Sequence, residues 1–328
     1  MAQSDLIRLV TLVLGAGLVG AETARQLVEQ GKRTILADVR LQSEAIGKIV
    51  ALDKVELAML DALSLPELLA LVREKGVDEI VHTAALISFV ERPYYGVLVN
   101  CVGTLNILEA ARLMDLGKVV FTSSHSVYRT WKSGWQQERQ WDEDTPLEPG
   151  NLYAATKGAS DLLGQGYHAA YGVNFVSLRF PFIFGPWSGS TGGTLTGLLH
   201  DLLRSAARGE NRKVTPSFHS EEILYSKDVA TSLLQALQAE NLHAGVFIIG
   251  MGRVYAFKEI LETINRLTPG SRLEVVDNAP QRAYKGFALR QASADISLAG
   301  KVLGFKPRFS LESALRDYSD WCRMHRLL

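Results

Sequence analysis

Residues 9–20 read LVTLVLGAGLVG, and this stretch decides the fold. Leu9–Leu14 is an unbroken apolar run, which is typical of a strand buried on both faces. Glycines follow at positions 15, 17 and 20, as in a tight turn that has no room for side chains. From Ala21 to Gln30 the apolar residues follow a helical period, which Gly31 ends. The stretch therefore predicts a strand, a glycine turn and a helix in immediate succession.

The first half of the chain repeats this alternation of short β-rich runs and longer helical patterns. Strands are predicted at Thr34–Ala37, Val55–Leu60, Glu79–His82, Lys118–Thr122 and Val173–Arg179, and helices at Leu65–Lys75, about Tyr94–Met114 and a segment that carries Tyr153 and ends at Gly172. Strands that alternate with helices form a parallel sheet with helices on both faces. We therefore expect an α/β fold built on a Rossmann-type doubly wound parallel sheet.

The composition excludes several classes of function. The chain has 328 residues with 35 basic and 35 acidic side chains, so its net charge of zero predicts no surface for nucleic acid. Cys101 and Cys322 cannot form a disulfide framework, and no metal-ligand spacing occurs. The apolar segment Leu6–Val19 lacks the basic leader and cleavage site of a signal peptide. No apolar stretch is expected to reach the roughly 20 residues of a membrane span. We expect a cytoplasmic protein without a bound metal, nucleic acid or membrane.

A glycine turn between a strand and a helix is a typical binding site for a dinucleotide pyrophosphate. The helix that follows offers free N–H groups and a partial positive charge to the phosphates. Asp38 ends the next predicted strand, where a carboxylate accepts hydrogen bonds from an adenosine 2′-hydroxyl and repels a 2′-phosphate. Arg40 lies close by and weakens this preference slightly. On balance the sequence predicts NAD rather than NADP.

Tyr153 and Lys157 stand four residues apart, on one face of a predicted helix. A phenol normally keeps its proton up to about pH 10. A neighbouring ammonium favours the phenolate, so we expect Lys157 to lower the pKa of Tyr153. Such a tyrosine can exchange a proton with a secondary alcohol or a ketone near neutral pH.

The alternation of strands and helices loosens after Phe180. Residues 185–193 (GPWSGSTGG) predict a flexible loop, and the remainder mixes helices, such as Asp228–Gln238 and Leu311–Trp321, with short strands such as Val246–Ile249. We therefore expect an NAD-binding domain with the catalytic groups over residues 1–180. A smaller α/β lobe, mainly for the substrate, is expected over residues 181–328, and the chain can cross back between the two.

The ordered motifs resemble those of the extended short-chain dehydrogenases/reductases, in the NAD-dependent epimerase/dehydratase family. After the glycine turn and Asp38 they are Asp61-Ala62, His82-Thr83-Ala84-Ala85, Asn100 with Gly103-Thr104, residues 122–128 (TSSHSVY), Tyr153 with Lys157, Arg179 through Gly185-Pro186, residues 225–230 (YSKDVA), and Leu303-Gly304-Phe305 with Pro307. The resemblance covers nearly the whole chain. It implies an NAD-dependent oxidoreductase that forms a homodimer through the helices of residues 94–114 and 152–171.

The resemblance also implies roles for single residues. Tyr153 would exchange the proton, Ser124 would orient the substrate oxygen, and Lys157 would hold the phenolate and the nicotinamide ribose. The implied cofactor-binding residues are Gly15, Gly17, Leu18, Val19, Gly20, Asp38, Val39, Asp61, Ala62, Thr83, Ala84, Ala85, Asn100, Thr122, Tyr153, Lys157, Phe180 and Pro181. The implied substrate contacts are Ser88, Ser124, His125, Phe182, Trp187, His219 and Arg282. For His125, Trp187, His219 and Arg282 a purely structural role is an equal alternative.

Three positions depart from the family pattern. The family's dehydratases carry Asp-Glu after the catalytic residue, where this chain has His125-Ser126, so dehydration is not expected. Its nucleotide-sugar members usually carry Asn at the position of Phe182 and Arg at the position of Glu221. The carboxylate of Glu221 would repel a phosphate. We therefore expect hydride transfer at a secondary alcohol or ketone of a sugar, a sugar acid or a polyol-like compound.

Two alternatives remain open for the function. One is a UDP-sugar 4-epimerase with tightly bound NAD, and the other is a non-catalytic NAD-binding regulator. The insert of residues 130–141, with Trp131, Trp135 and Trp141, is expected to be a pocket lid, a subunit contact or a packed surface loop.

Overall fold

The computed structural model describes residues 9–89, 91–128, 136–137, 140–190, 193–216, 218, 220–240, 242–276, 289–290 and 293–328. Its centre is a seven-stranded sheet in the order β12-β7-β5-β4-β1-β2-β3. Every neighbouring pair in this sheet is parallel. The strands are β1 (Val10–Leu14), β2 (Arg33–Asp38), β3 (Glu56–Met59), β4 (Glu79–His82), β5 (Lys118–Ser124), β7 (Phe175–Phe180) and β12 (Ala244–Ile248). The predicted α/β class with a Rossmann-type sheet is confirmed.

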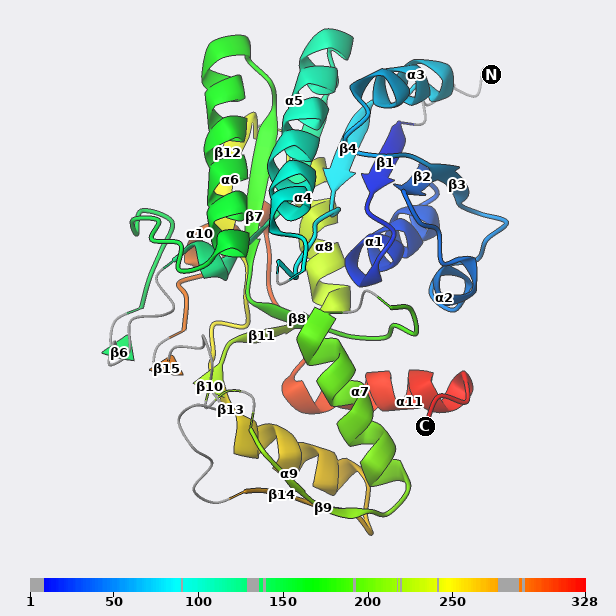
Figure 1. The fold of residues 1–328 in the computed structure, drawn as a ribbon, viewed down its shortest axis with the longest axis vertical. Coiled ribbons are helices and arrows are strands. Elements are labelled where there is room, and N and C mark those ends of the chain that lie inside the picture. The colour runs from blue at the N-terminus through cyan, green and yellow to red at the C-terminus, as the bar shows by residue number, and fades with distance from the viewer. Residues whose placement is uncertain are drawn as a thin grey trace, which may run out of the picture.

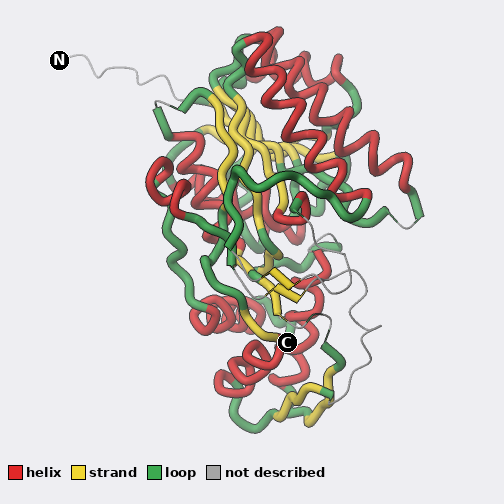
Figure 2. The backbone as a smooth tube through the Cα atoms, turned by 90° about the vertical axis from the view of Figure 1, so that its left-hand side faces the viewer, coloured by secondary structure: helices red, strands yellow, loops and turns green. Residues whose placement is uncertain are grey.

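Helices cover both faces of this sheet (Figures 1 and 2). One layer contains α3 (Leu65–Lys75), α4 (Pro93–Val97), α5 (Gly103–Met114) and α6 (Leu152–Tyr171). The other contains α1 (Leu18–Glu29), α2 (Ser43–Gly47), α8 (Ser226–Gln238) and α10 (Ser297–Leu303). Alternate residues of β1 serve the two sides, because Leu12 and Leu14 belong to the core under α3 and α5, whereas Val13 belongs to the core under α1 and α8.

The ends of the helices follow from the local sequence. Gly76 and Gly172 stand immediately after α3 and α6 with φ of 64° and 73°, a left-handed conformation that favours glycine. Asn151 begins α6, because its side-chain oxygen accepts a hydrogen bond from the N–H of Ala154 at 2.8 Å. This cap fixes the start of the helix two residues before Tyr153.

A smaller lobe lies beyond the carboxyl ends of the strands (Figure 1). Its core is formed by α7 (Gly193–Ala207), α9 (Phe257–Leu267) and α11 (Leu311–Met324). Its short strands are β8 (Phe182–Phe184), β9 (Asn211–Val214), β10 (Ser220–Glu221), β11 (Ile223–Tyr225), β13 (Tyr255–Ala256) and β14 (Arg272–Val275). Two-residue strands β6 (Gln136–Gln137) and β15 (Leu289–Arg290) pair with each other at one side.

The chain returns from the smaller lobe to the large sheet. Strand β12 pairs with β7 over five residues and forms the edge of that sheet, while the preceding helix α8 packs against α1. The strand predicted at Val246–Ile249, in the part of the chain expected to form the smaller lobe, therefore belongs to the large sheet. The parallel sheet is thus built from residues on both sides of position 180.

Among the described residues, Pro93–Met114 has the length and apolar composition of a membrane-spanning helix, with 22 residues and a mean hydropathy of 1.3. The expectation that no apolar stretch reaches the length of a membrane span was wrong for this segment. In the structure its inner side chains, including Ile107, Leu108 and Ala111, are buried against the sheet. That burial accounts for part of the apolar composition of this segment.

Candidate active site

A pocket of about 1250 Å³ lies at the carboxyl ends of the central strands, between the sheet and the smaller lobe. Its walls come from the glycine turn, the loop after β4, the end of β5, the start of α6 and the segment that follows β7. Open α/β sheets bind ligands in this crevice, where the strand order reverses. The volume exceeds the roughly 300–1,000 Å³ of a pocket for one drug-sized ligand, so the space suits a dinucleotide together with a second molecule.

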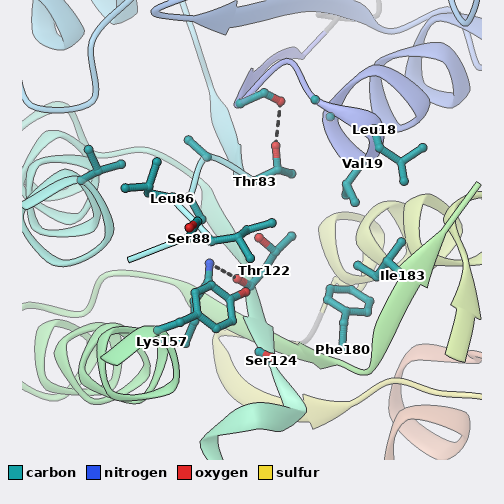
Figure 3. Close-up of a pocket in the computed structure, with 18 of the residues that line it drawn as sticks. Leu18, Val19, Thr83, Leu86, Ser88, Thr122, Ser124, Lys157, Phe180 and Ile183 are labelled. Atoms are coloured by element: carbon teal, nitrogen blue, oxygen red, sulfur yellow. Dashed lines mark hydrogen bonds between the residues drawn. The ribbon is translucent and has the colours of Figure 1, made fainter. Parts of the chain in front are cut away.

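The glycine turn is held so closely to the loop after β4 that two of its positions exclude a side chain. Gly15 has a φ of 112°, and a Cβ there would lie 2.4 Å from the backbone nitrogen of Ala84. A Cβ at Gly20 would lie 1.7 Å from the carbonyl oxygen of Gly15. The hydroxyl of Thr83 donates to that same oxygen at 2.8 Å (Figure 3). The turn is therefore rigid, and its outer surface forms one end of the pocket.

The residues around this turn fit NAD. No side chain caps the N-terminus of α1 and no acidic residue lies in its first turn, so its N–H groups and positive end suit a pyrophosphate. The carboxylate of Asp38 lines the pocket and accepts the N–H of Ala16 at 2.7 Å and that of Arg40 at 3.1 Å. Each carboxylate oxygen has two lone pairs, so Asp38 can also accept a ribose hydroxyl.

Most residues that the sequence implied for the cofactor line this one pocket. They are Gly15, Gly17, Leu18, Val19, Gly20, Asp38, Val39, Asp61, Ala62, Thr83, Ala84, Ala85, Thr122, Tyr153, Lys157, Phe180 and Pro181. Figure 3 shows Leu18 and Val19 at the end with the glycine turn, whereas Ser124 and Lys157 lie at the other end. Segments far apart in the sequence are thus brought together around a single crevice.

Asn100 is the exception among these residues, because it lies behind the pocket wall. It is buried in a π-helical turn (Leu98–Val102) between α4 and α5. Its side chain accepts the N–H of Leu86 at 2.8 Å and donates to the carbonyl of Leu86 at 3.0 Å. It also donates to the hydroxyl of Thr156, on α6, at 2.9 Å. Asn100 therefore holds the pocket loop to the helix of Tyr153 instead of facing the cofactor.

Tyr153 and Ser124 meet at the inner end of the pocket. Ser124 is the last residue of β5, and it lines the pocket together with Tyr153. Burial raises the pKa of Tyr153 to about 12, and the hydroxyl of Ser124 acts in the opposite direction. The direction is opposite to the lowering expected from the sequence, because desolvation of the phenolate dominates over any effect of Lys157. In the protein alone, Tyr153 is thus a protonated phenol at neutral pH.

Lys157 lies under the pocket floor, one turn after Tyr153. Its ammonium donates to the carbonyl of Thr122 at 2.7 Å and lies 6.0 Å from the centre of the Tyr153 ring (Figure 3). Burial lowers the pKa of Lys157 to about 8, and the carboxylate of Asp161 acts in the opposite direction. The lysine is therefore poised to gain or lose its charge within one or two pH units of neutrality.

Asp161 is the centre of a buried polar network behind these groups. Its carboxylate accepts hydrogen bonds from Ser123 at 3.0 Å, from Ser177, and from the guanidinium of Arg179 at 2.9 Å. Arg179 also donates to the phenol of Tyr128. Burial raises the pKa of Asp161, whereas Arg179 and the hydroxyls oppose that rise. The network fixes a negative charge one helical turn beyond Lys157.

The residues implied for the substrate are only partly brought together. Ser88, Ser124, His125 and Phe182 line the pocket. His125 is buried and its ring lies edge-on to that of Trp141, with centres 5.8 Å apart. Trp187 does not line the pocket; it is 3% exposed and belongs to the apolar core around α1, in agreement with the structural role given as its alternative. His219, Arg282, Trp131 and Trp135 lie outside the described residues.

Several pocket residues did not enter the sequence-based site. Phe89, Arg92, Tyr95, Leu195 and Gln42 line the pocket, and the guanidinium of Arg92 lies 4.7 Å from the centre of the Tyr95 ring. Glu221, noted in the sequence only as a departure, also lines it. The topology could have indicated Phe89–Tyr95, since the loop after a central parallel strand opens into this crevice. No motif marks Gln42, which immediately precedes α2, or Leu195 on α7.

Comparisons with known proteins agree with this architecture. The family model described as "NAD dependent epimerase/dehydratase family" matches residues 11–250. The chain is 24% identical to a UDP-glucuronate 4-epimerase of Thermodesulfobacterium geofontis, over 95% of both chains. It is 29% identical to a dTDP-glucose 4,6-dehydratase of Streptomyces niveus, over 76% of this chain and 71% of the other. An L-threonine dehydrogenase from Clostridium difficile shares the fold, with a TM-score of 0.82 and 22% identity over 98% of this chain and 99% of that one.

The matched residues contain the glycine turn, Asp38, Ser124, Tyr153 and Lys157, and they end just after β12. They therefore cover the whole sheet and most of the pocket. The chain belongs to the NAD dependent epimerase/dehydratase family, and NAD is its cofactor.

Proposed function

We propose that this enzyme transfers a hydride between NAD and a secondary alcohol or ketone, with Tyr153 as the acid and base. The observation that carries the proposal is the joint placement of three features in one pocket. These are the glycine turn with Asp38, the side chains of Tyr153 and Ser124, and the buried ammonium of Lys157. Hydride and proton transfer at one carbon and its oxygen need such an arrangement.

The side chains have distinct parts in this chemistry. A protonated Tyr153 phenol donates its proton to a ketone oxygen, and in the reverse direction the phenolate accepts the proton of a secondary alcohol. The hydroxyl of Ser124 orients the same oxygen, because Ser124 lines the pocket together with Tyr153 and acts on the pKa of its phenol. When bound, NAD supplies the acceptor or donor of the hydride. Lys157 supplies a positive charge near the phenol and holds its place through Thr122.

We further propose that the substrate is a sugar, a sugar acid or a polyol-like compound without a nucleoside diphosphate. His125 lines the pocket where the family's dehydratases carry an acidic residue, which argues against dehydration. Phe182 and Glu221 also line it, where nucleotide-sugar members carry Asn and Arg. The described walls thus lack the residues with which those members hold a diphosphate.

The relatives named above support a second candidate, a UDP-sugar 4-epimerase that retains its NAD through a full turnover. Purified protein separates the two. A dehydrogenase accumulates NADH when NAD and a free polyol, sugar or sugar acid are supplied. An epimerase carries NAD through purification, interconverts a UDP-sugar and accumulates no NADH. Conversion of a UDP-sugar, without NADH from any free compound, would establish this second candidate and exclude the first.

Replacement of Tyr153 by Phe tests the role of the phenol. The change removes only the hydroxyl, so turnover should fall by roughly 100- to 10,000-fold while the fold and NAD affinity persist. Steady-state kinetics and calorimetric titration with NAD measure the two properties. Tyr171→Phe is a matched control, since Tyr171 lies at the exposed end of the same helix. Unchanged turnover in Tyr153→Phe would exclude the proposed proton transfer.

A further inference from the structure

One segment of the smaller lobe reaches the NAD-binding domain beside the pocket, where it contacts Gln42. We call residues Gly185–Ser190, which follow β8, the strap. At its far end the strap meets Gln42, four residues after Asp38 and immediately before α2. Gln42 itself lines the pocket, on the side of Asp38. The strap therefore joins the two lobes next to the position expected for the adenosine ribose.

Hydrogen bonds from Ser190 join the strap to the side chain of Gln42. The side-chain oxygen of Gln42 accepts the N–H of Ser190 at 2.8 Å and its hydroxyl at 3.1 Å. Both bonds are exposed to solvent. Exposed neutral hydrogen bonds contribute little individually, so this contact can open and close at small cost.

The middle of the strap is anchored and closely packed. Trp187 is buried in the core that also contains Ala45 and Ile46 of α2. A Cβ at Gly189 would lie 2.6 Å from the indole ring of Trp187 and 2.8 Å from the side-chain oxygen of Gln42. Only glycine allows the strap to pass between these two groups. The buried Trp187 holds the middle of the strap in place, while Ser190 at its end contacts Gln42.

The same side of the NAD-binding domain has a second tie to the smaller lobe. The indole N–H of Trp321, on α11, donates to the carbonyl of Lys48 at 3.1 Å, at the other end of α2. The smaller lobe thus contacts the segment from Gln42 to Lys48 at both of its ends. Since α11 provides a fixed attachment, the strap can release Gln42 while the lobes stay together.

We propose that Gln42 and the strap form a latch over the adenosine end of NAD, and that opening of this latch governs cofactor release. The inference depends on NAD binding in this pocket and not on the identity of the alcohol. Hydride transfer takes place at the opposite end, beside Tyr153 and Ser124. The latch therefore affects the dissociation rate of NAD and does not involve the groups that transfer the proton.

The rate of cofactor dissociation tests the latch directly. NADH bound to the purified enzyme is displaced with excess NAD, and the loss of its fluorescence is followed by stopped flow. We expect Gln42→Ala to accelerate release about tenfold, because it removes the hydrogen bonds to the N–H and the hydroxyl of Ser190. Ser190→Ala should accelerate release less, since the backbone N–H remains. Gln238→Ala, an exposed glutamine on α8, is the control and should leave release unchanged.

Two further variants distinguish a latch from a direct contact between Gln42 and NAD. Gly189→Ala displaces the strap without changing Gln42, so it should accelerate release as Gln42→Ala does. In the double variant Gln42→Ala/Ser190→Ala the effects should be non-additive, because both changes break one contact. Additive effects, or release as slow in the single variants as in the wild type, would overturn the latch. Because dissociation is measured without a substrate, these outcomes do not depend on the proposed reaction.

Discussion

Lys157 shows how burial changes the chemistry of a single residue. Its pKa in the folded protein is about 8, compared with 10.5 for an unperturbed lysine. At pH values between these two pKa values the unfolded chain binds more protons than the folded one. The contribution of Lys157 to the free energy of unfolding therefore increases as the pH rises.

This difference gives a prediction for the cofactor-free enzyme. From pH 7 to pH 9 the free energy of unfolding of the wild type should increase by about 1 kcal/mol relative to that of Lys157→Met. Urea unfolding curves of both proteins at the two pH values measure it. An equal difference at both values would mean that Lys157 keeps an ordinary pKa in the folded state.

Asp38 gives a second prediction about one residue. Asp38→Ala removes a charged acceptor from the adenosine end, so the affinity for NAD should fall roughly 10- to 100-fold, as expected for a hydrogen bond to a charged group of about 1.5–3 kcal/mol. The preference for NAD over NADP should shrink as well, since a 2′-phosphate is no longer repelled. Calorimetric titration with both dinucleotides measures this. Asp53→Ala, in an exposed turn before β3, serves as the control.

At the residue scale the sequence indicates which side chains meet, but not how strongly each is buried. The spacing of the motifs was sufficient to predict that Ser124, Tyr153 and Lys157 lie in one pocket. The direction of the pKa shift of Tyr153 was wrong, because desolvation depends on side chains that pack around the phenol from distant segments. Asn100 was expected to contact the cofactor, but its side chain lies behind the pocket wall. The motif identifies this residue, whereas the direction of its side chain depends on the π-helical turn.

Among the elements, the π-helical turn between α4 and α5 has a measurable role. It directs Asn100 at Leu86 on one side and at Thr156 on the other. Asn100→Ala should reduce the free energy of unfolding by about 1–3 kcal/mol, because it removes the partner of the N–H and the carbonyl of Leu86, which are only partly accessible to solvent.

The same variant should also raise the KM for NAD, since the loop after β4 forms part of the cofactor pocket. Denaturant unfolding and steady-state kinetics measure the two effects. Asn211→Ala, exposed on β9, should change neither. If Asn100→Ala lost stability with an unchanged KM, the turn would support the fold without positioning the loop.

Periodicity predicted β1 to β5 and β7, the helices α1, α3 and α6, and one helix over the residues of α4 and α5, because each is a regular run that ends at glycine or at a polar residue. It did not predict the five-residue helix α2. It was less informative after Phe180, where α7 and α9 follow a glycine-rich loop and the strands have two to five residues. Short strands bury too few residues to leave a clear alternation. The pairing of β12 with β7 could not be read from the sequence, since it depends on a long-range crossover.

At the scale of the whole molecule, apolar side chains remain exposed on the outer surface of the α4–α6 layer. Tyr94, Val102 and Leu162 are 76%, 37% and 61% exposed. Helices α5 and α6 lie side by side here (Figure 1). We propose that this surface is the homodimer interface, in which each copy contributes the same pair of helices.

A charge at the centre of that surface tests the proposal. The wild type should be a dimer by light scattering, and Leu162→Glu should shift it to monomer, because a buried carboxylate without a partner is costly. Leu298→Glu, on the opposite helical layer and 37% exposed in the wild type, should remain dimeric. A monomeric wild type, or a dimeric Leu162→Glu, would place the interface elsewhere or exclude it.

The return of the chain to form β12 has a consequence for synthesis on the ribosome. Until residue 248 has emerged, β7 is an edge strand with its buried residues Val176 and Leu178 beside an unpaired backbone. Such an edge can pair with other chains, so the nascent protein is exposed to misassembly for about 70 residues of translation after β7. A chain interrupted between β7 and β12 should therefore aggregate rather than accumulate as a free NAD-binding domain.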